Sequence, residues 1–347
     1  MTGTLPTSRI PDPKAAPPLR WGVLGTGGIA AGFISALQAT RQRLVAVGSR
    51  SAEKGRAFGE RHGAERFFGS YEELVGDDQV DVVYVATPHS EHLANALLAI
   101  EEGKPVLIEK AFTRNAAEAR QVFDAARAAG VAVMEAMWTR FLPSTDIVRQ
   151  LLANGELGDV ETLFADHGQW FAEDPQFRLF DPAQAGGAML DLGVYPVSFS
   201  HFVFGTPGRI QAAGTKAFTG VDRQISAVLS DYPDHATGQS LVNTTLASKT
   251  PTVALISGTE ARIEIPGAFY APQRIKLIGR GGSFVESAPP QITGHMGLCY
   301  EAAHFATVIA EGRLESDLLP WDETLAVMET MDELRRQTGS ELPGETL

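Results

Sequence analysis

A glycine-rich turn between an apolar run and a helix-compatible segment constrains this chain more than any other feature. Leu19 to Ala30 reads L-R-W-G-V-L-G-T-G-G-I-A, and Ile29 to Ala39 can continue it as a helix. In this G-x-G-x-x-A spacing, Gly25 makes the tight turn, Gly27 lets a pyrophosphate approach the backbone, and Ala30 allows close helix packing. The phosphates would lie at a helix N-terminus, where free N–H groups favour negative charge. The sequence therefore predicts a dinucleotide site with contacts from Gly25, Thr26, Gly27, Gly28, Ile29 and Ala30.

Length and charge limit the class of protein. The chain has 347 residues, enough for two domains, since a domain usually contains about 100 to 200 residues. It carries 29 Lys and Arg against 42 Asp and Glu, a net charge of −13, and such a surface repels nucleic acids and anionic lipids. No stretch reaches the roughly 18 apolar residues of a spanning helix. We therefore expect no nucleic-acid partner and no membrane partner.

The residues after the second predicted strand bear on the choice of cofactor. Arg43 to Gly48 is an apolar, β-branched run that predicts a strand, and Ser49 and Arg50 follow it. An NAD site usually has an acid here, about 20 residues past the turn, which bonds the ribose 2′-hydroxyl. An arginine suits a 2′-phosphate instead and can stack on adenine. The sequence therefore favours NADP over NAD, with Ser49 and Arg50 as contacts, and a solvated loop arginine is the alternative.

Strands and helices alternate through the first part of the chain. Strands are predicted at Val80 to Ala86, Gly103 to Glu109 and Val131 to Met134, with a helix at about Asn115 to Ala129. This order predicts a parallel sheet with right-handed crossovers, which is a Rossmann domain. Loops at the carboxyl ends of such strands lie beside the cofactor. We therefore predict cofactor contacts from Thr87, Pro88, His89 and His92.

The two loop histidines have other interpretations. Each could instead be a polar surface or capping residue. A metal-binding pair is disfavoured because no third ligand with suitable spacing is near, so no metal is expected.

The pattern changes near Arg140. A helix is predicted to about Asn154, and Val160 to Phe171 predicts the first strand of a second sheet. Strand-like runs without intervening helices then follow at Ile225 to Leu229, Gln239 to Leu246, Thr252 to Ile256 and Ala261 to Ile265. Helices at about Tyr300 to Glu311 and Trp321 to Gln337 end the chain. This is typical of an antiparallel sheet with one face packed by helices.

The predicted fold class is α/β, with an N-terminal Rossmann parallel sheet and a C-terminal α+β domain that has a large, mostly antiparallel open sheet. The expected domains are a flexible arm at 1–18, a Rossmann domain at 19–141 and a substrate and dimerisation domain at 142–347. The arm is rich in proline and has no apolar core like that of a signal peptide. With a single cysteine, Cys299, no intrachain disulfide can form. We expect a cytoplasmic protein.

Five motifs in order give the chain a family resemblance. They are the glycine turn, A-T-P-H-S-E-H at 86–92, E-K at 109–110, M-E-A-M-W-T-R-F at 134–141 and G-G-A-M-L-D-L-G-V-Y-P at 186–196. Together they resemble the glucose-fructose oxidoreductase, inositol dehydrogenase and rhizopine catabolism (Gfo/Idh/MocA) family. The branch most similar is that of the dimeric trans-1,2-dihydrobenzene-1,2-diol dehydrogenases and NADP-dependent D-xylose dehydrogenases. The resemblance covers nearly the whole chain beyond the arm.

The resemblance implies roles for particular residues. It places Lys110 of the E-K pair beside the reacting carbon, the substrate between sheet and nicotinamide, and a homodimer or homotetramer contact on the open sheet. The family's usual proline after that lysine, often in a cis bond, is Ala111 here, so that feature is expected to be absent or replaced. The family's element of Asp-x-Gly followed by His or Tyr maps onto Asp191 to Tyr195, which reads D-L-G-V-Y. In the dihydrodiol branch its tyrosine is regarded as the acid/base.

The residues themselves support this chemistry. Oxidising an alcohol with a nicotinamide requires removal of the hydroxyl proton as hydride leaves. A phenol has a pKa near 10, and a nearby ammonium favours its anion, so Tyr195 with Lys110 supplies a suitable pair. Asp191 lies at i−4 from Tyr195 and would share its helix face, with Pro196 tolerated only in the first turn. We predict Lys110, Tyr195 and Asp191 as catalytic residues.

Further residues are candidates for the same site. Trp138 and Arg140 follow a strand end and could line the nicotinamide pocket, although a packing tryptophan is nearly as plausible. Arg178 lies in a loop that could cover the substrate. His167 and His304 are expected to be structural. The predicted cofactor contacts thus also include Glu109, Lys110, Trp138 and Arg140, and the substrate contacts are Lys110, Trp138, Asp191, Tyr195 and Arg178.

These observations predict an NADP-dependent oxidoreductase acting on a sugar, a polyol or a cyclic diol. Two alternatives stay open within the same family. One is a catalytically silent NADP-binding regulator, which the intact Lys110, Asp191 and Tyr195 disfavour. The other is a glycosidase that keeps its nicotinamide bound and shows no net NADPH formation.

Overall fold

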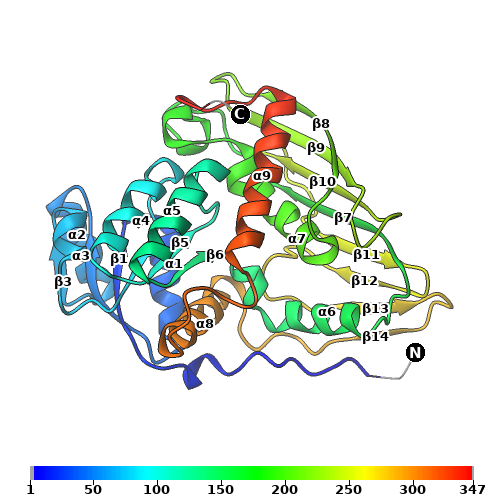
Figure 1. Cartoon of the computed structure of the whole chain (residues 1–347), viewed down its shortest axis with the longest axis horizontal. Coiled ribbons are helices and arrows are strands. Elements are labelled where there is room, and N and C mark those ends of the chain that lie inside the picture. The colour runs from blue at the N-terminus through cyan, green and yellow to red at the C-terminus, as the bar shows by residue number, and fades with distance from the viewer. Residues whose placement is uncertain (1–3, 346–347) are drawn as a thin grey trace. The chain divides into compact units, whose positions relative to one another are not determined.

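The computed structural model describes residues 4–345, which form two compact units (Figure 1). The Rossmann unit comprises residues 11–141 and 294–325, and the large-sheet unit comprises residues 4–10, 142–293 and 326–345. Residues 294–325 were expected in the second domain, but they pack on the Rossmann sheet instead. The indole N–H of Trp321 donates to the carbonyl oxygen of Val133 at 2.8 Å, and α8 (Leu298–Ala310) contacts α1 (Gly28–Leu37).

The Rossmann unit contains the predicted parallel sheet. Its six strands have the order β3-β2-β1-β4-β5-β6, and every neighbouring pair is parallel. The strands are β1 (Arg20–Leu24), β2 (Arg43–Gly48), β3 (Arg66–Phe68), β4 (Val82–Val85), β5 (Val106–Glu109) and β6 (Val133–Ala136). Near-continuous Val, Ile and Leu runs suit strands that are buried on both faces. The helices between them are α1, α2 (Ala52–His62), α3 (Tyr71–Val75), α4 (His92–Glu101) and α5 (Ala116–Ala129).

Local signals define where these helices begin and end. The side chain of Asn115 accepts a hydrogen bond from the Glu118 N–H at the start of α5, and Gly130 ends that helix with a φ of 67°. Ser51 and Gly63 do the same for α2. A side-chain acceptor at the N-cap and a left-handed glycine after the last turn satisfy backbone groups that a helix leaves unpaired.

The large-sheet unit contains eight strands in the order β14-β13-β12-β11-β7-β10-β9-β8 (Figure 1). All neighbours are antiparallel except β7 and β10. The strands are β7 (Val160–Gly168), β8 (Arg209–Lys216), β9 (Asp222–Ser230), β10 (Gln239–Thr245), β11 (Ala254–Gly258), β12 (Ala261–Ile265), β13 (Lys276–Gly279) and β14 (Phe284–Glu286). The helices are α6 (Pro143–Ala153), α7 (Val194–Phe204), which packs on β7 and β10, and the last part of α9 (Trp321–Thr338). The predicted fold class is confirmed.

The strands β7 and β11 are shorter than predicted beside the loop that carries Thr250 and Thr252. β7 ends at Gly168 rather than Phe171, because the loop at Thr250 closes on it and the Gly168 N–H donates to Thr250 Oγ1 at 2.8 Å. β11 begins at Ala254 rather than Thr252, since Thr252 has a φ of 57° that no strand contains.

The described part of the N-terminal arm makes fixed contacts rather than forming a flexible segment. The Arg9 guanidinium and backbone N–H both bind the buried carboxylate of Asp146 at 2.7 Å. Further along, the Gln42 side chain donates to the Pro17 carbonyl oxygen at 2.8 Å. The contacts from Arg9 supply the partner that the buried Asp146 carboxylate requires. No helix in residues 4–345 combines the length and hydropathy needed to cross a membrane.

Candidate functional site

The glycine turn of the Rossmann unit has the geometry of a dinucleotide cradle. Gly25 has a φ of 111°, and a Cβ there would lie 2.6 Å from the carbonyl oxygen of Ala86, so only glycine fits. A Cβ at Gly27 or Gly28 would meet no protein atom within 4 Å. Gly27 is the N-cap of α1, and no side chain caps this helix. Its first N–H groups therefore suit the phosphates of a dinucleotide.

A second set of predicted residues is linked by hydrogen bonds at the ends of β4 and β5. His92 is fully buried, with Nε2 2.9 Å from the Thr87 carbonyl oxygen and Nδ1 3.0 Å from the Ala111 carbonyl oxygen. Burial lowers the pKa of His92, which favours the neutral ring. His92 therefore ties the loop at Thr87 to the backbone next to Lys110. Its contact with a cofactor stays a prediction, as do those of Pro88 and His89.

Lys110 itself is half-buried at the end of β5, and His89 Nε2 lies 3.3 Å from its carbonyl oxygen. The Lys110–Ala111 peptide bond is cis. The expectation that the cis feature would be absent or replaced when alanine follows the lysine is therefore wrong.

Trp138 and Arg140 lie in a short 3-10 helix, Trp138–Phe141, and are almost wholly buried. Trp138 stacks on His295 with a centroid separation of 5.8 Å, and Arg140 Nη1 binds Glu323 Oε1 at 2.6 Å. These contacts give both residues a role in packing residues 294–325 on the sheet. Their predicted contact with the cofactor stays a prediction.

The buried glutamates of the same unit include Glu109 on β5, Glu135 on β6 and Glu301 on α8. Tyr84 donates a hydrogen bond to Glu109, and Thr324 donates to Glu135 at 3.2 Å. Within residues 4–345, neither oxygen of Glu301 has a hydrogen-bond partner. Burial raises the pKa of Glu301, and the charges of Glu109 and Glu135 raise it further. Both causes favour the protonated, neutral form of Glu301.

Glu135 makes folding stability depend on pH. Burial raises its pKa from 4.5 to about 7, although Thr324 and Arg140 oppose the change. The folded state binds this proton more tightly, so the contribution of Glu135 is fully present below pH 4.5 and is lost as pH rises through 7. The difference is worth about 3 kcal/mol.

The free energy of unfolding of Glu135→Gln, which cannot titrate, should rise relative to that of wild type by about 2.5 kcal/mol between pH 5 and pH 8. Urea unfolding at the two pH values measures this difference. Glu102→Gln, which changes an exposed glutamate of the same unit, controls for the loss of one acid. An equal difference from wild type at both pH values would contradict the assignment.

In the large-sheet unit, Asp191 and Tyr195 lie on a distorted helical segment. A π-helix at Met189–Gly193 runs directly into α7, and the two residues are 7% exposed each. π-helical turns are rare and occur frequently at functional sites. Arg178 Nη2 binds Asp191 Oδ1 at 2.9 Å. The structure thus brings Arg178 and Asp191 together, and their contact with a substrate stays a prediction.

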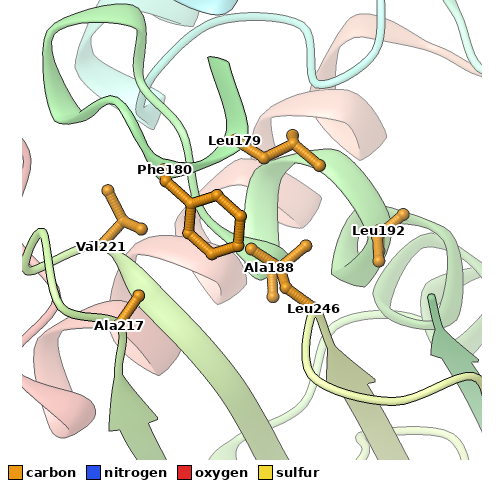
Figure 2. Close-up of a cluster of buried hydrophobic side chains, with 7 residues drawn as sticks. All are labelled: Leu179, Phe180, Ala188, Leu192, Ala217, Val221 and Leu246. Atoms are coloured by element: carbon orange, nitrogen blue, oxygen red, sulfur yellow. The ribbon is translucent and has the colours of Figure 1, made fainter. Parts of the chain in front are cut away.

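Buried polar groups on the sheet hold this segment. Asp222 at the start of β9 accepts a hydrogen bond from the Met189 N–H at 2.6 Å, and a Cβ at Gly187 would lie 2.2 Å from its Oδ1. An apolar cluster beside it joins the loop, the π-helix and the sheet (Figure 2). Its members are Leu179, Phe180, Ala188, Leu192, Ala217, Val221 and Leu246. Sequence reasoning missed Asp222, because its nearness to Met189 depends on the fold.

Two aromatic rings contact Tyr195. Tyr270 stacks on it with centroids 4.4 Å apart, and His167 packs at 5.3 Å. His167 lies 4.6 Å from Tyr270, and its Nδ1 is 3.2 Å from the Leu192 carbonyl oxygen. The position of His167 at the end of the first strand was a signal, but only the structure places it against the tyrosine.

Comparisons with known proteins extend to most of the chain. Residues 19–137 match the family model described as an oxidoreductase family with an NAD-binding Rossmann fold, GFO_IDH_MocA, and residues 146–264 match the GFO/IDH/MocA C-terminal domain. The trans-1,2-dihydrobenzene-1,2-diol dehydrogenase of Sus scrofa is 36% identical, over 94% of this chain and 98% of that protein. The D-xylose 1-dehydrogenase (NADP(+)) of Hypocrea jecorina is 36% identical over 94% and 93%.

The fold also resembles solved structures of low identity. The aldose-aldose oxidoreductase from Caulobacter crescentus, complexed with glycerol, superposes with a TM-score of 0.81 at 24% identity, over 93% of this chain and 98% of that chain. A levoglucosan dehydrogenase in complex with NADH and levoglucosan gives a TM-score of 0.84 at 17% identity, with the same coverage. At these identities the likeness concerns the fold alone.

Proposed function

This chain belongs to the Gfo/Idh/MocA oxidoreductase family, and from this premise we propose that it transfers hydride between NADP and a CH–OH carbon of a sugar, polyol or cyclic diol. The observation that carries the proposal is the 36% identity, over 94% of the chain, to dehydrogenases that are named for a dihydrodiol and for D-xylose. The uncapped glycine turn of α1 fits the dinucleotide.

The proposed mechanism assigns a role to each catalytic residue. Held at the glycine turn of Gly25 and Gly27, NADP would supply the hydride chemistry. The Tyr195 Oη takes the proton of the substrate hydroxyl, and the Lys110 ammonium stabilises the negative charge that develops on that oxygen. Asp191, which is held by Arg178, orients the hydroxyl through a charge-assisted hydrogen bond.

Formation of NADPH, followed at 340 nm across aldoses, inositols and a trans-dihydrodiol with NADP and separately with NAD, tests this function. Turnover that favours NADP supports it. NADP binding without turnover of any substrate would favour the silent regulator. Purification with bound cofactor and cleavage of a glycoside without net NADPH would favour the glycosidase.

Arg50 accounts for the preference for NADP in this proposal. It is exposed directly after β2, next to the buried Ser49, and its charge opposes the burial that raises the pKa of Tyr71. Hydrogen bonds to a charged group are worth about 1.5–3 kcal/mol. We expect Arg50→Ala to raise the KM for NADP about 10- to 100-fold and to leave the KM for NAD within about twofold.

Initial rates with each cofactor measure this effect. Arg41→Ala, which removes an exposed arginine before β2, should leave both KM values unchanged. An equal rise for NAD and NADP in Arg50→Ala would show that the arginine does not bind the 2′-phosphate.

The open face of the large sheet supports a homodimer or homotetramer. Leu241, Phe164 and Leu255 lie side by side on β10, β7 and β11, and Phe164 and Leu241 are 38% and 40% exposed. Together with residues of β8 and β9, Phe164 and Leu241 line a groove of about 730 Å³. A charged side chain that is buried in an apolar subunit contact of this kind has no partner of opposite charge.

We expect Leu241→Arg to weaken self-association about 100-fold by light scattering after size exclusion. Phe218→Arg alters an apolar residue that is exposed outside the groove, and it should not change the oligomer. A monomeric wild type would refute the proposal. The single cysteine, which is buried, also supports a reducing, cytoplasmic setting.

A further inference from the structure

A cavity of about 640 Å³ adjoins the aromatic cluster around Tyr195, wholly within the large-sheet unit. His167 and Tyr270 line it, and both pack on Tyr195. Trp170 and Lys249 also line it. Because His167 and Tyr270 line the cavity and also pack on Tyr195, a molecule held in the cavity lies next to the proposed acid/base.

The side chains of the cavity combine an apolar platform with a positive charge. Trp170 is 66% exposed, although a large indole is usually mostly buried. No ion pair with a carboxylate is formed by Lys249 in residues 4–345, although the chain carries 42 acids against 29 bases. An aromatic face binds the apolar face of a ring, and an ammonium binds an anion.

The loop that carries Lys249 is held rigidly by a buried acid. Asp166 is 3% exposed, and its two oxygens accept hydrogen bonds from the N–H groups of Thr252 and Val253 at 3.1 and 3.0 Å. Thr250 makes two hydrogen bonds with Gly168. Its Oγ1 accepts from the Gly168 N–H at 2.8 Å, and its own N–H donates to the Gly168 carbonyl oxygen at 3.1 Å. The cavity wall is therefore formed before any ligand binds, which lowers the entropic cost of binding.

Thr252 adds an independent sign of a functional loop. Its φ of 57° lies in the left-handed region, which is an outlier for a β-branched residue. Backbone strain of this kind persists only where the surroundings enforce it, and it clusters at ligand-binding and active sites. Here the hydrogen bonds that the Thr252 and Val253 N–H groups donate to Asp166 enforce it.

We propose that this cavity binds the part of the substrate away from the reacting carbon, and that this part is a ring bearing an anionic group, either a carboxylate or a phosphate. The ring lies against Trp170 and Tyr270, and the Lys249 ammonium binds the anion. This inference rests on the proposed function for the link to Tyr195. It makes the preferred substrate an acidic sugar or an acidic cyclic diol rather than a neutral one.

The tryptophans of this chain allow a direct binding test. Of its four tryptophans, Trp21, Trp138 and Trp321 are at most 6% exposed, so Trp170 is the one that a soluble quencher reaches. Acrylamide quenching of the full chain with NADP present is measured against D-glucuronate, D-glucose 6-phosphate and D-glucose. Trp170→Phe should remove the quenchable emission.

We expect D-glucuronate or D-glucose 6-phosphate to protect Trp170 at concentrations about 10-fold lower than D-glucose does, and added salt to weaken this protection. The two anions separate a carboxylate site from a phosphate site. Lys249→Met should require about 10-fold more anion and leave the weak effect of glucose unchanged, whereas Lys249→Arg should retain most of the protection. Lys216→Met, which removes an exposed lysine on β8, should behave as wild type.

The test separates failure of the inference from failure of the proposed function. Equal protection by glucose and both anions, no protection by any of them, or unchanged protection in Lys249→Met would overturn the anionic cavity even if neutral sugars are oxidised. If protection follows Lys249 but no compound is oxidised, the cavity stands and the dehydrogenase assignment fails. If oxidation also occurs, the KM for the anion should rise about 10-fold in Lys249→Met with kcat within about twofold.

Discussion

Replacing Lys110 by methionine should lower kcat/KM by about 10³-fold while NADP still binds. Methionine has a similar length but no charge, so the alkoxide that forms as hydride leaves loses the cation that stabilises it. A factor of this size corresponds to about 4 kcal/mol of transition-state stabilisation. Cofactor binding should persist, because the glycine turn that holds the pyrophosphate lies on a different loop, at the end of β1.

Initial rates at saturating NADP, together with a fluorescence titration of NADP, separate these two effects. Lys14→Met removes an exposed lysine of the same unit and should leave kcat/KM unchanged. Lys110→Arg should not restore activity, since a guanidinium differs from an ammonium in shape and hydration. If Lys110→Met kept its activity within about 10-fold, the catalytic assignment would be wrong.

Tyr195→Phe should lower kcat by about 10²- to 10³-fold with a small change in KM. Phenylalanine keeps the ring that stacks on Tyr270 at 4.4 Å, and the site is 7% exposed, so the packing persists while the hydroxyl is lost. Without this hydroxyl, water must act as the base that removes the proton from the substrate. The rise of kcat with pH in the oxidising direction should flatten.

A pH profile of kcat for wild type and Tyr195→Phe measures this change. Tyr232→Phe provides the control, because Tyr232 is a buried phenol of the same unit whose hydroxyl contacts Ser200 and Ser240. That variant should keep the wild-type profile. An unaltered profile in Tyr195→Phe would assign the proton transfer to another group.

The fold was predictable wherever local sequence determines local structure. β2 and β12 have their predicted bounds, and α5 begins directly after Asn115 because that side chain caps it. Predictions failed where a distant segment intervenes. The left-handed backbone at Thr252 shortens β11, and Asp166, which accepts hydrogen bonds from the Thr252 and Val253 N–H groups, lies 86 residues earlier in the chain than Thr252.

The candidate site divides in the same way. The turn at Gly25 could be predicted from the sequence, because only glycine tolerates its φ of 111° next to Ala86 and such turns have a short, regular spacing of glycines. The residues that surround Tyr195 could not be predicted from the sequence. His167 and Tyr270 come from separate parts of the sheet, and nothing in their own neighbours in sequence predicts that they meet the same ring.

The sequence by itself thus determined the family, the order of the two sheets and the residue types of the chemistry, because glycine turns, caps and alternating strands act over a few residues. Only the tertiary structure decided that residues 294–325 belong with the Rossmann sheet, that the arm is held by Asp146, and that an aromatic cavity with Lys249 adjoins Tyr195. These features depend on burial and on pairing of charges between segments that are far apart in the chain. Such energies arise only when the chain has folded and water has been excluded.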